Sequence, residues 1–251
     1  GAGSMAQGKN SGIKDIWRRA ESFLNEDGYD WKAQEGQRWF IDAAKKRGVN
    51  QFIAFLNSPT VTMTKNNKAY SSGGTRANLE ESKYIDYVDF LTIFLERFKR
   101  LYHVEFDYIS PFNEPQWDWK KESGQEGSPW QNNEIESLTR LLDAKLIEKK
   151  LTTKIELAEA GQLNYLYQNA NKKGRGNQIQ EFFDPNALNY IGDLKTLAHK
   201  ISGHSYYTNF DATKLISTRF ELNNKLKTLA TPLEFWMTEY CVLEKNEDIV
   251  G

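Results

Sequence analysis

The chain has 251 residues, with 33 lysines and arginines against 34 aspartates and glutamates, so its formal net charge is −1. This length suits one domain the size of an α/β barrel and is sufficient to bury a large core. The charge balance predicts no nucleic-acid partner. No apolar run is long enough for a membrane span. The single cysteine, Cys241, excludes an internal disulfide. The opening stretch GAGSMAQGKN lacks a basic segment followed by an apolar one, so it predicts no signal peptide.

Helical and strand-like segments alternate along the chain. After a possible strand end at Gly1, the first half predicts a helix over 34–48, a strand over 49–59, a helix over 78–102 and a strand over 106–115. The second half predicts a helix over 132–150, a strand over 154–161, a weaker helix near 186–199, a strand over 201–207, a helix over 212–230 and a last strand over 233–240. Two polar stretches, 65–78 and 171–178, are typical of long loops.

This alternation predicts a parallel sheet, in either a closed barrel or an open doubly wound fold. The polar residues help to choose between the two. They occur at or just beyond the carboxyl ends of different predicted strands, and they are Asn57, Glu114, Glu159, Tyr206 and Glu239. A closed barrel brings such ends to one pocket, whereas an open sheet spreads them along a crevice. The pattern therefore favours a TIM-type (β/α)8 barrel.

Two glutamates end apolar strands that are distant in the sequence. Glu114 lies in ISPFNEPQWDW and Glu239 lies in LEFWMTEY, where alternation predicts a shared face with Leu233, Phe235 and Met237. Two facing carboxyl groups can cleave a glycosidic bond, because one attacks the anomeric carbon while the other protonates the leaving oxygen. Two separate salt bridges would explain the same residues equally well, since lysine and arginine are plentiful.

The motifs around both glutamates resemble the clan A retaining glycoside hydrolases, particularly the endo-β-1,6-galactanase-like members of glycoside hydrolase family 30. SPFNEP and its Trp-rich loop are similar to the fourth strand of that family, FWMTEY to the seventh, FLNSPTVTMT to the third and HSYY to the sixth. GAGS followed by WRRAESF is similar to the stretch after the second strand. The resemblance implies that residues 1–251 form a partial (β/α)8 barrel without its first and last strands. An accessory β-sandwich is expected outside this chain.

The resemblance also implies roles for individual residues. Glu239 would be the nucleophile and Glu114 the acid/base, with Asn113 contacting the sugar 2-hydroxyl and Tyr206 bonded to the nucleophile. His204 would line the pocket. The other candidates for substrate contact are Asn57, Glu159 and the tryptophans Trp117 and Trp119, which directly follow the acid and are predicted to stack on sugar. Ordinary packing would explain the histidine and the tryptophans, and a structural salt bridge would explain Glu159.

The family resemblance implies a carbohydrate substrate, no cofactor, and a secreted, periplasmic or cell-surface location. Thr60, Val61 and Thr62 stand where galactanase-like members carry aromatic residues, so xylanase, β-1,6-glucanase and β-glucosidase-like specificities stay open. A carbohydrate-binding pseudoenzyme of the same fold is the alternative function from another class.

The stretch GAGSM lacks the Gly-Lys-Ser/Thr of a phosphate-binding loop. The three histidines form no metal-ligand pattern with the cysteine, although a structural metal on carboxylates stays open.

Overall fold

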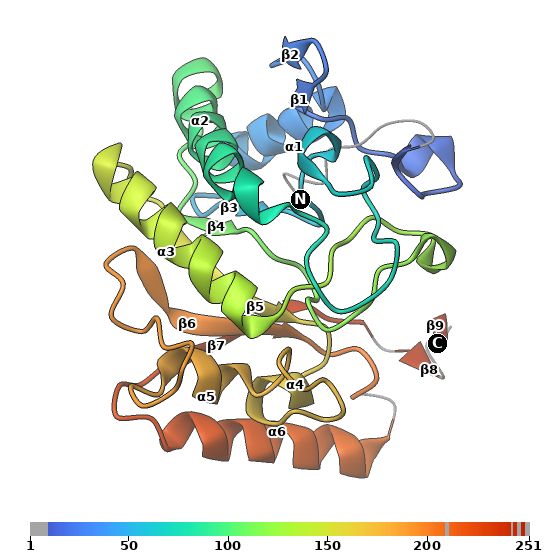
Figure 1. Cartoon of the computed structure of the whole chain (residues 1–251). Coiled ribbons are helices and arrows are strands. Elements are labelled where there is room, and N and C mark those ends of the chain that lie inside the picture. Colours follow the sequence, from blue (N-terminus) through green and yellow to red (C-terminus); the bar gives the residue numbers. More distant parts are fainter. Residues whose placement is uncertain (1–9, 209–210, 242, 245–246, 249–251) are drawn as a thin grey trace.

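The computed structural model describes residues 10–208, 211–241, 243–244 and 247–248. Its centre is a parallel sheet of five strands in the order β3-β4-β5-β6-β7 (Figure 1). These strands are β3 (Ile53–Phe55), β4 (Tyr108–Ser110), β5 (Lys154–Ala160), β6 (Leu197–His204) and β7 (Glu234–Glu239). Two antiparallel hairpins flank it, one made of β1 (Leu24–Asn25) and β2 (Gly28–Tyr29), the other of β8 (Leu243–Glu244) and β9 (Glu247–Asp248).

Helices separate consecutive strands of the sheet. In Figure 1, α2 lies above the strands, α3 passes beside them between β4 and β6, and α4, α5 and α6 lie below β6 and β7. The helices are α1 (Glu35–Lys46), α2 (Tyr84–Tyr102), α3 (Asn132–Glu148), α4 (Asn164–Tyr167), α5 (Gln178–Phe183) and α6 (Ala212–Lys227). This strand–helix order in one parallel sheet is a partial TIM-type fold, as the sequence predicts.

The sequence places α2 and α3 against the sheet through their apolar faces. On α2, Tyr87, Leu91 and Phe94 recur at helical spacing and are buried, and the helix ends at His103, whose positive φ of 54° stops its continuation. Helix α3 begins with a capping box, in which the side chains of Gln131 and Glu134 each accept a backbone N–H. The left-handed residue after α2 and the capping box before α3 therefore determine where these two helices end and begin.

The prediction of a helix near 186–199 is wrong. The segment after α5 forms turns, and its last residues, Leu197 to His199, already belong to β6. Pro185 and Gly192 interrupt the helical pattern, and Tyr190 packs so close to Gly192 that a Cβ there would lie 2.8 Å from its ring. The short helices α4 and α5 lie in segments for which the sequence predicts no helix or strand, apart from Gln178, which ends the predicted loop 171–178. The possible strand end at Gly1 lies outside the described residues.

The face that β7 presents to the site also differs from the prediction. Phe235 and Met237 pack against the hydrophobic core, whereas the Trp236 ring contacts Lys200 and Thr238 donates a hydrogen bond to Glu159. The pairing of β6 with β7 is shifted between Gly203 and His204, so His204 lies opposite Glu239. This irregularity breaks strict alternation, because the added residue moves the following side chain onto the other face.

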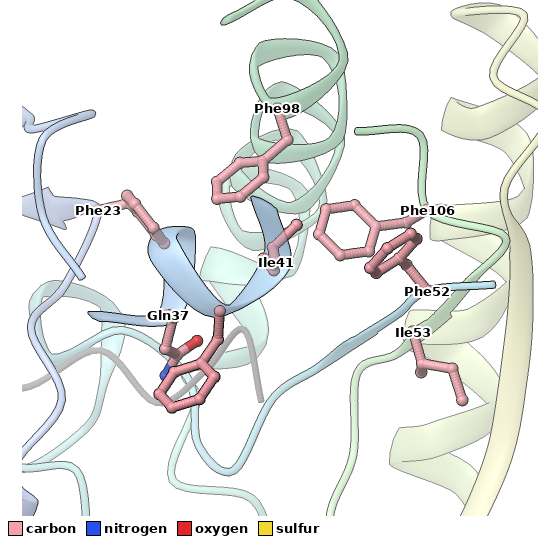
Figure 2. A pocket seen from close by; sticks show the side chains of 8 residues that line it. Phe23, Gln37, Ile41, Phe52, Ile53, Phe98 and Phe106 are labelled. Carbon is pink, nitrogen blue, oxygen red and sulfur yellow. The ribbon is translucent and has the colours of Figure 1, made fainter. Parts of the chain in front are cut away.

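Two strands, β3 and β7, form the edges of the described sheet, and apolar space remains beside each. A cavity of about 300 Å³ lies between α1 and β3 and is lined by Phe23, Phe40, Phe52 and Phe98 among others (Figure 2). A second cavity of about 490 Å³ lies between the edge strands, with Phe55 of β3 on one wall and Trp236 and Glu239 of β7 on the other. Within the described residues, no helix is long and apolar enough to cross a membrane.

Candidate active site

The carboxyl ends of β4 and β5 carry two glutamates in unusual backbone conformations. Glu114 follows β4 with φ of 42°, and Glu159 lies near the end of β5 with φ of 50°. A non-glycine residue in this region is strained, and such strain is typical of functional sites. The backbone N–H of Glu114 donates to the carbonyl of Glu159 at 2.8 Å, so the strained segments hold each other in place.

The carboxyl groups of Glu114 and Glu239 meet at the ring of His204. The Nδ1 atom of His204 lies 2.9 Å from Glu114 Oε1 and 3.4 Å from Glu239 Oε2. One oxygen of each carboxyl group and a nitrogen of this ring all lie within 4.8 Å of one another. The hydroxyl of Tyr206 donates to Glu239 Oε2 at 2.9 Å, which is the contact that the family resemblance implies.

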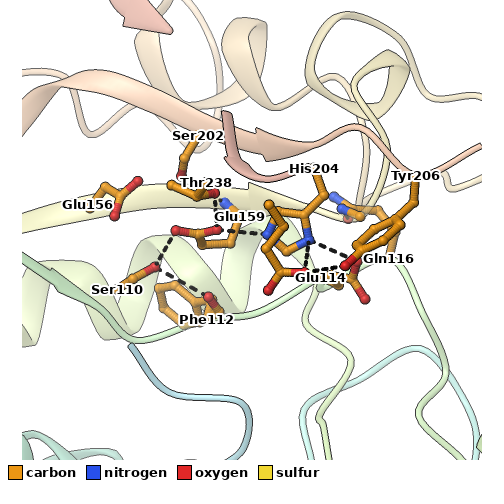
Figure 3. A network of polar contacts seen from close by, with 12 residues as sticks. Ser110, Phe112, Glu114, Gln116, Glu156, Glu159, Ser202, His204, Tyr206 and Thr238 are labelled. Atoms are coloured by element: carbon orange, nitrogen blue, oxygen red, sulfur yellow. Dashed lines mark hydrogen bonds and ion pairs between the residues drawn. The ribbon is translucent and has the colours of Figure 1, made fainter. Parts of the chain in front are cut away.

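The other side of the His204 ring contacts Glu159, which is buried (Figure 3). The His204 Nε2 atom lies 2.8 Å from Glu159 Oε2. The same oxygen accepts a hydrogen bond from Thr238 at 2.5 Å, and Glu159 Oε1 accepts one from Ser110 at 3.3 Å. Glu159 is therefore held as an acceptor on both oxygens, which is the pattern of an ionised carboxylate.

Burial and hydrogen bonding shift the pKa values of Glu114 and His204 in opposite directions. Burial raises the pKa of Glu114, partly opposed by the hydrogen bond with His204. Burial alone would lower the pKa of His204, but the hydrogen bonds with Glu114 and Glu159 outweigh it and raise that pKa to about 10. At neutral pH, the site thus combines an imidazolium with a Glu114 carboxyl that retains its proton more readily than an exposed one.

Glu114, His204 and Glu239 are also the residues whose ligand atoms converge closely enough for a metal ion. However, both nitrogens of the His204 ring contact carboxylate oxygens. A ring protonated on both nitrogens has no lone pair to offer to a metal. The hydrogen-bond pattern therefore fits an acid–base cluster better than a metal centre.

The two tryptophans after the acid occupy different environments. Trp119 is 6% exposed and its Nε1 donates to the Glu114 carbonyl at 3.0 Å, so the prediction that it stacks on sugar does not agree with the structure. Trp117 is partly exposed, with the Lys172 ammonium 5.0 Å from its ring centre. Trp130, in the same loop, is buried against Phe112. A stacking role therefore remains a prediction for Trp117 alone.

The two predicted asparagines also differ in their surroundings. Asn113 is buried beside Glu114, and its side-chain oxygen Oδ1 has no hydrogen-bond partner among the described residues. A buried acceptor without a donor is costly, and a sugar hydroxyl would satisfy it. Asn57 lies just beyond β3, is partly buried and makes no side-chain hydrogen bond within the described part of the chain. Its contact with substrate stays a prediction.

Sequence reasoning missed several residues that support the glutamates. Ser110 and Thr238 bond to Glu159, while Lys200 and Glu156 lie buried on the same side of the sheet. Glu156 carries a sequence signal, because it places a charge between the apolar residues Ile155 and Leu157 of a predicted strand, whereas Lys200 lies just before the predicted strand 201–207. The two hydroxyl residues carry none, since serine and threonine are common in strands.

Comparison with known proteins identifies related sequences. A family model described as O-Glycosyl hydrolase family 30 matches residues 1–251. An endo-β-1,6-galactanase from Hypocrea rufa is 27% identical over 136 residues, which are 53% of this chain and 28% of that protein. The chain therefore spans only part of the length of this curated relative.

Solved structures show the same architecture. A conserved exported protein from Bacteroides fragilis is 33% identical with a TM-score of 0.88, and the match covers 95% of this chain and 49% of that one. The catalytic domain of xylanase C from Talaromyces cellulolyticus is 18% identical with a TM-score of 0.57, covering 86% of this chain and 43% of that one. At the latter identity the likeness shows the fold alone.

Proposed function

Because the chain belongs to O-glycosyl hydrolase family 30, we propose that it acts as a retaining glycoside hydrolase, with Glu239 as the nucleophile and Glu114 as the acid/base. The observation that carries this proposal is the convergence of their carboxyl oxygens to within 4.8 Å. Retaining enzymes hold the two carboxyl groups roughly 5–5.5 Å apart, whereas inverting enzymes leave a gap of about 6.5–9.5 Å for a water molecule. The short separation supports direct attack by a carboxylate.

In the first step, a Glu239 oxygen attacks the anomeric carbon while the glycosidic C–O bond breaks. The proton of Glu114 passes to the leaving oxygen, which departs as an alcohol. Tyr206 holds Glu239 in position through its hydroxyl. The greater exposure of Glu239, whose side chain is 36% accessible against 11% for Glu114, suits a nucleophile that must stay ionised.

In the second step, Glu114 acts as a base. It accepts a proton from a water molecule whose oxygen attacks the anomeric carbon, and the bond to Glu239 breaks with release of its carboxylate. His204 contacts the acid at both stages, and its positive charge stabilises Glu114 once the proton has left. The site thus regains its starting protonation after each turnover.

We propose a β-linked polysaccharide or oligosaccharide as the substrate, with β-1,6-galactan as the first candidate because of the galactanase from Hypocrea rufa. By analogy with the exported relative from Bacteroides fragilis, we propose that the enzyme works outside the cytoplasm. Xylan and β-1,6-glucan remain alternative substrates.

The test is a screen of the full-length protein on β-1,6-galactan, xylan, β-1,6-glucan and aryl β-glycosides. NMR of the first product formed would follow the anomeric configuration. We expect hydrolysis of at least one substrate with retention, and initial products of inverted configuration would contradict the mechanism. Binding of oligosaccharides without any turnover would instead favour the carbohydrate-binding pseudoenzyme.

A further inference from the structure

Lys200 is a buried cation that the proposed mechanism does not use. It lies on β6, 3% exposed, with its ammonium 3.6 Å from the ring centre of Tyr108 and 3.2 Å from that of Trp236. Its Nζ atom has no hydrogen-bond partner among the described residues and lies 3.8 Å from Glu156 Oε1. Burying a charged lysine between two aromatic faces is costly unless nearby groups compensate its charge.

The neighbours of Lys200 connect it to the catalytic glutamates. The carboxyl groups that act on its charge are Glu156 and Glu159 of β5 and Glu234 of β7. Glu156 interacts with Glu159, Glu159 contacts His204, and His204 contacts Glu114. Figure 3 shows Glu156, Glu159, His204 and Glu114 in one row along the site side of the sheet. A continuous line of ionisable groups therefore runs from Lys200 to the acid.

The charges along this line balance in one protonation state. Burial and the neighbouring Glu159 carboxyl raise the pKa of Glu156 to about 8, so this carboxyl keeps its proton at neutral pH. With protons also on Glu114 and on both nitrogens of His204, the cations of Lys200 and His204 match the carboxylates of Glu159 and Glu239. Transfer of the Glu114 proton to the leaving group keeps this balance, because Glu239 becomes a neutral ester as Glu114 becomes charged.

We propose that Lys200 is a positioning residue of the catalytic site, the buried counter-charge of the carboxyl pair Glu156 and Glu159, of which Glu159 holds the His204 ring against Glu114. The inference rests on the proposed function, in which Glu114 is the acid/base. Without the lysine, the negative charge of this carboxyl pair is no longer compensated, and the cluster takes up a proton. His204 then loses one of its two carboxylate partners and loses its proton more easily, and Glu114 loses the nearby positive charge that favours its ionised form.

The experiment compares Lys200→Met with Lys200→Arg in the full-length protein. For Lys200→Met, the apparent pKa of the basic limb in the pH profile of kcat/KM should rise by about half a unit or more, because Glu114 binds its proton more tightly. The titration midpoint of the His204 ring, followed by ¹⁵N NMR, should fall by about one unit or more. Lys200→Arg should restore both towards wild type. His103→Gln and His199→Gln assign the ring signals.

Two further variants separate charge from packing. Glu159→Gln should lower the His204 midpoint as Lys200→Met does, while Lys154→Met, an exposed lysine on the neighbouring strand, should change neither midpoint. Should Lys200→Met fail to fold, Lys200→Gln takes its place with the same expected shifts. A loss of rate or stability with both midpoints unmoved would overturn the proposal and leave Lys200 as a packing residue.

The two readouts also separate this inference from the proposed function. Absence of hydrolysis on every glycoside would refute the glycosidase proposal, and the His204 titration would still decide whether Lys200 controls the cluster. Conversely, an active enzyme in which neither Lys200→Met nor Lys200→Gln moves the His204 midpoint keeps its function and refutes the role of Lys200.

Discussion

At the scale of single residues, the roles of Glu114 and Glu239 can be told apart by removing each in turn. Glu239→Ala should lose the covalent route and cost about a thousandfold in rate, roughly 4 kcal/mol of barrier. Azide should then attack from the vacated side and give a glycosyl azide of inverted configuration. Glu114→Ala should still react with an activated aryl glycoside, because such a leaving group needs little protonation, and azide should give a product of retained configuration.

The stereochemistry of the two azide products, measured by NMR, checks this assignment. Exchange of the two configurations would mean that Glu114 and Glu239 have each other's roles. A loss smaller than tenfold in both variants would exclude the proposed mechanism.

Tyr206 offers a milder test of the same site. Its hydroxyl donates to Glu239, and Tyr206→Phe removes this bond while keeping the ring. We expect kcat to fall about tenfold or more, which corresponds to roughly 1.4 kcal/mol, with little change in KM. Tyr190→Phe, at a tyrosine outside the site, is the matched control. Equal kinetics for Tyr206→Phe and wild type would show that the bond does not serve catalysis.

A site residue could be predicted from the sequence only where it lies in a motif or at the end of an apolar strand. Glu114 and Glu239 were identifiable because each ends an apolar strand within a recognisable motif. The inward direction of Trp236 and Thr238 was not, because the shifted pairing beside His204 breaks the alternation that strand reasoning assumes. The bridging position of His204 was missed for a similar reason, since it depends on side chains from three other strand ends.

At the scale of elements, helix limits followed from local signals where the pattern was long. The predicted helix over 132–150 is observed as Asn132–Glu148, whereas the one near 186–199 is absent. Strand β5 begins at the predicted Lys154 because its polar-to-apolar change is abrupt. The short helices α4 and α5 span too few residues to give a periodic signal, and their formation depends on tertiary contacts.

The loop after β4 depends on close packing between Trp119 and Gly127. A Cβ on Gly127 would lie 2.2 Å from the indole, so Gly127→Ala must displace the ring that bonds the Glu114 carbonyl. We expect a loss of about 2 kcal/mol of stability, measured by denaturant unfolding, together with reduced activity. Gly36→Ala is the control, because it lies in α1 with open space around it and should be neutral or stabilising. Equal stability of both variants would contradict the packing argument.

At the scale of the whole molecule, the buried carboxyl of Glu126 links folding to pH. It accepts a hydrogen bond from Ser11 on one oxygen, and its other oxygen has no hydrogen-bond partner in the described part of the chain. Burial raises the pKa of Glu126 to about 7. The unfolded chain releases this proton at lower pH than the folded one, so the contribution of Glu126 to stability falls as pH rises from about 4.5 through 7.

Glu126→Gln should therefore stabilise the fold at pH 8.5 by up to about 3 kcal/mol and have little effect near pH 4.5. Thermal unfolding at both pH values measures this difference. Glu122→Gln, an exposed glutamate of the same loop, should show no such pH dependence. A stabilisation of Glu126→Gln that is equal at both pH values would contradict the linkage.

The position of Glu239 on an edge strand makes catalysis sensitive to the curvature of the sheet. Glu114 follows an inner strand with neighbours on both sides, whereas β7 is paired within the described sheet only with β6. An outward shift of β7 would carry the proposed nucleophile away from the acid, and it would also pull Phe235 and Met237 off the hydrophobic core. Under the proposed mechanism, the separation of the two carboxyl groups therefore depends on how closely β7 stays paired with β6.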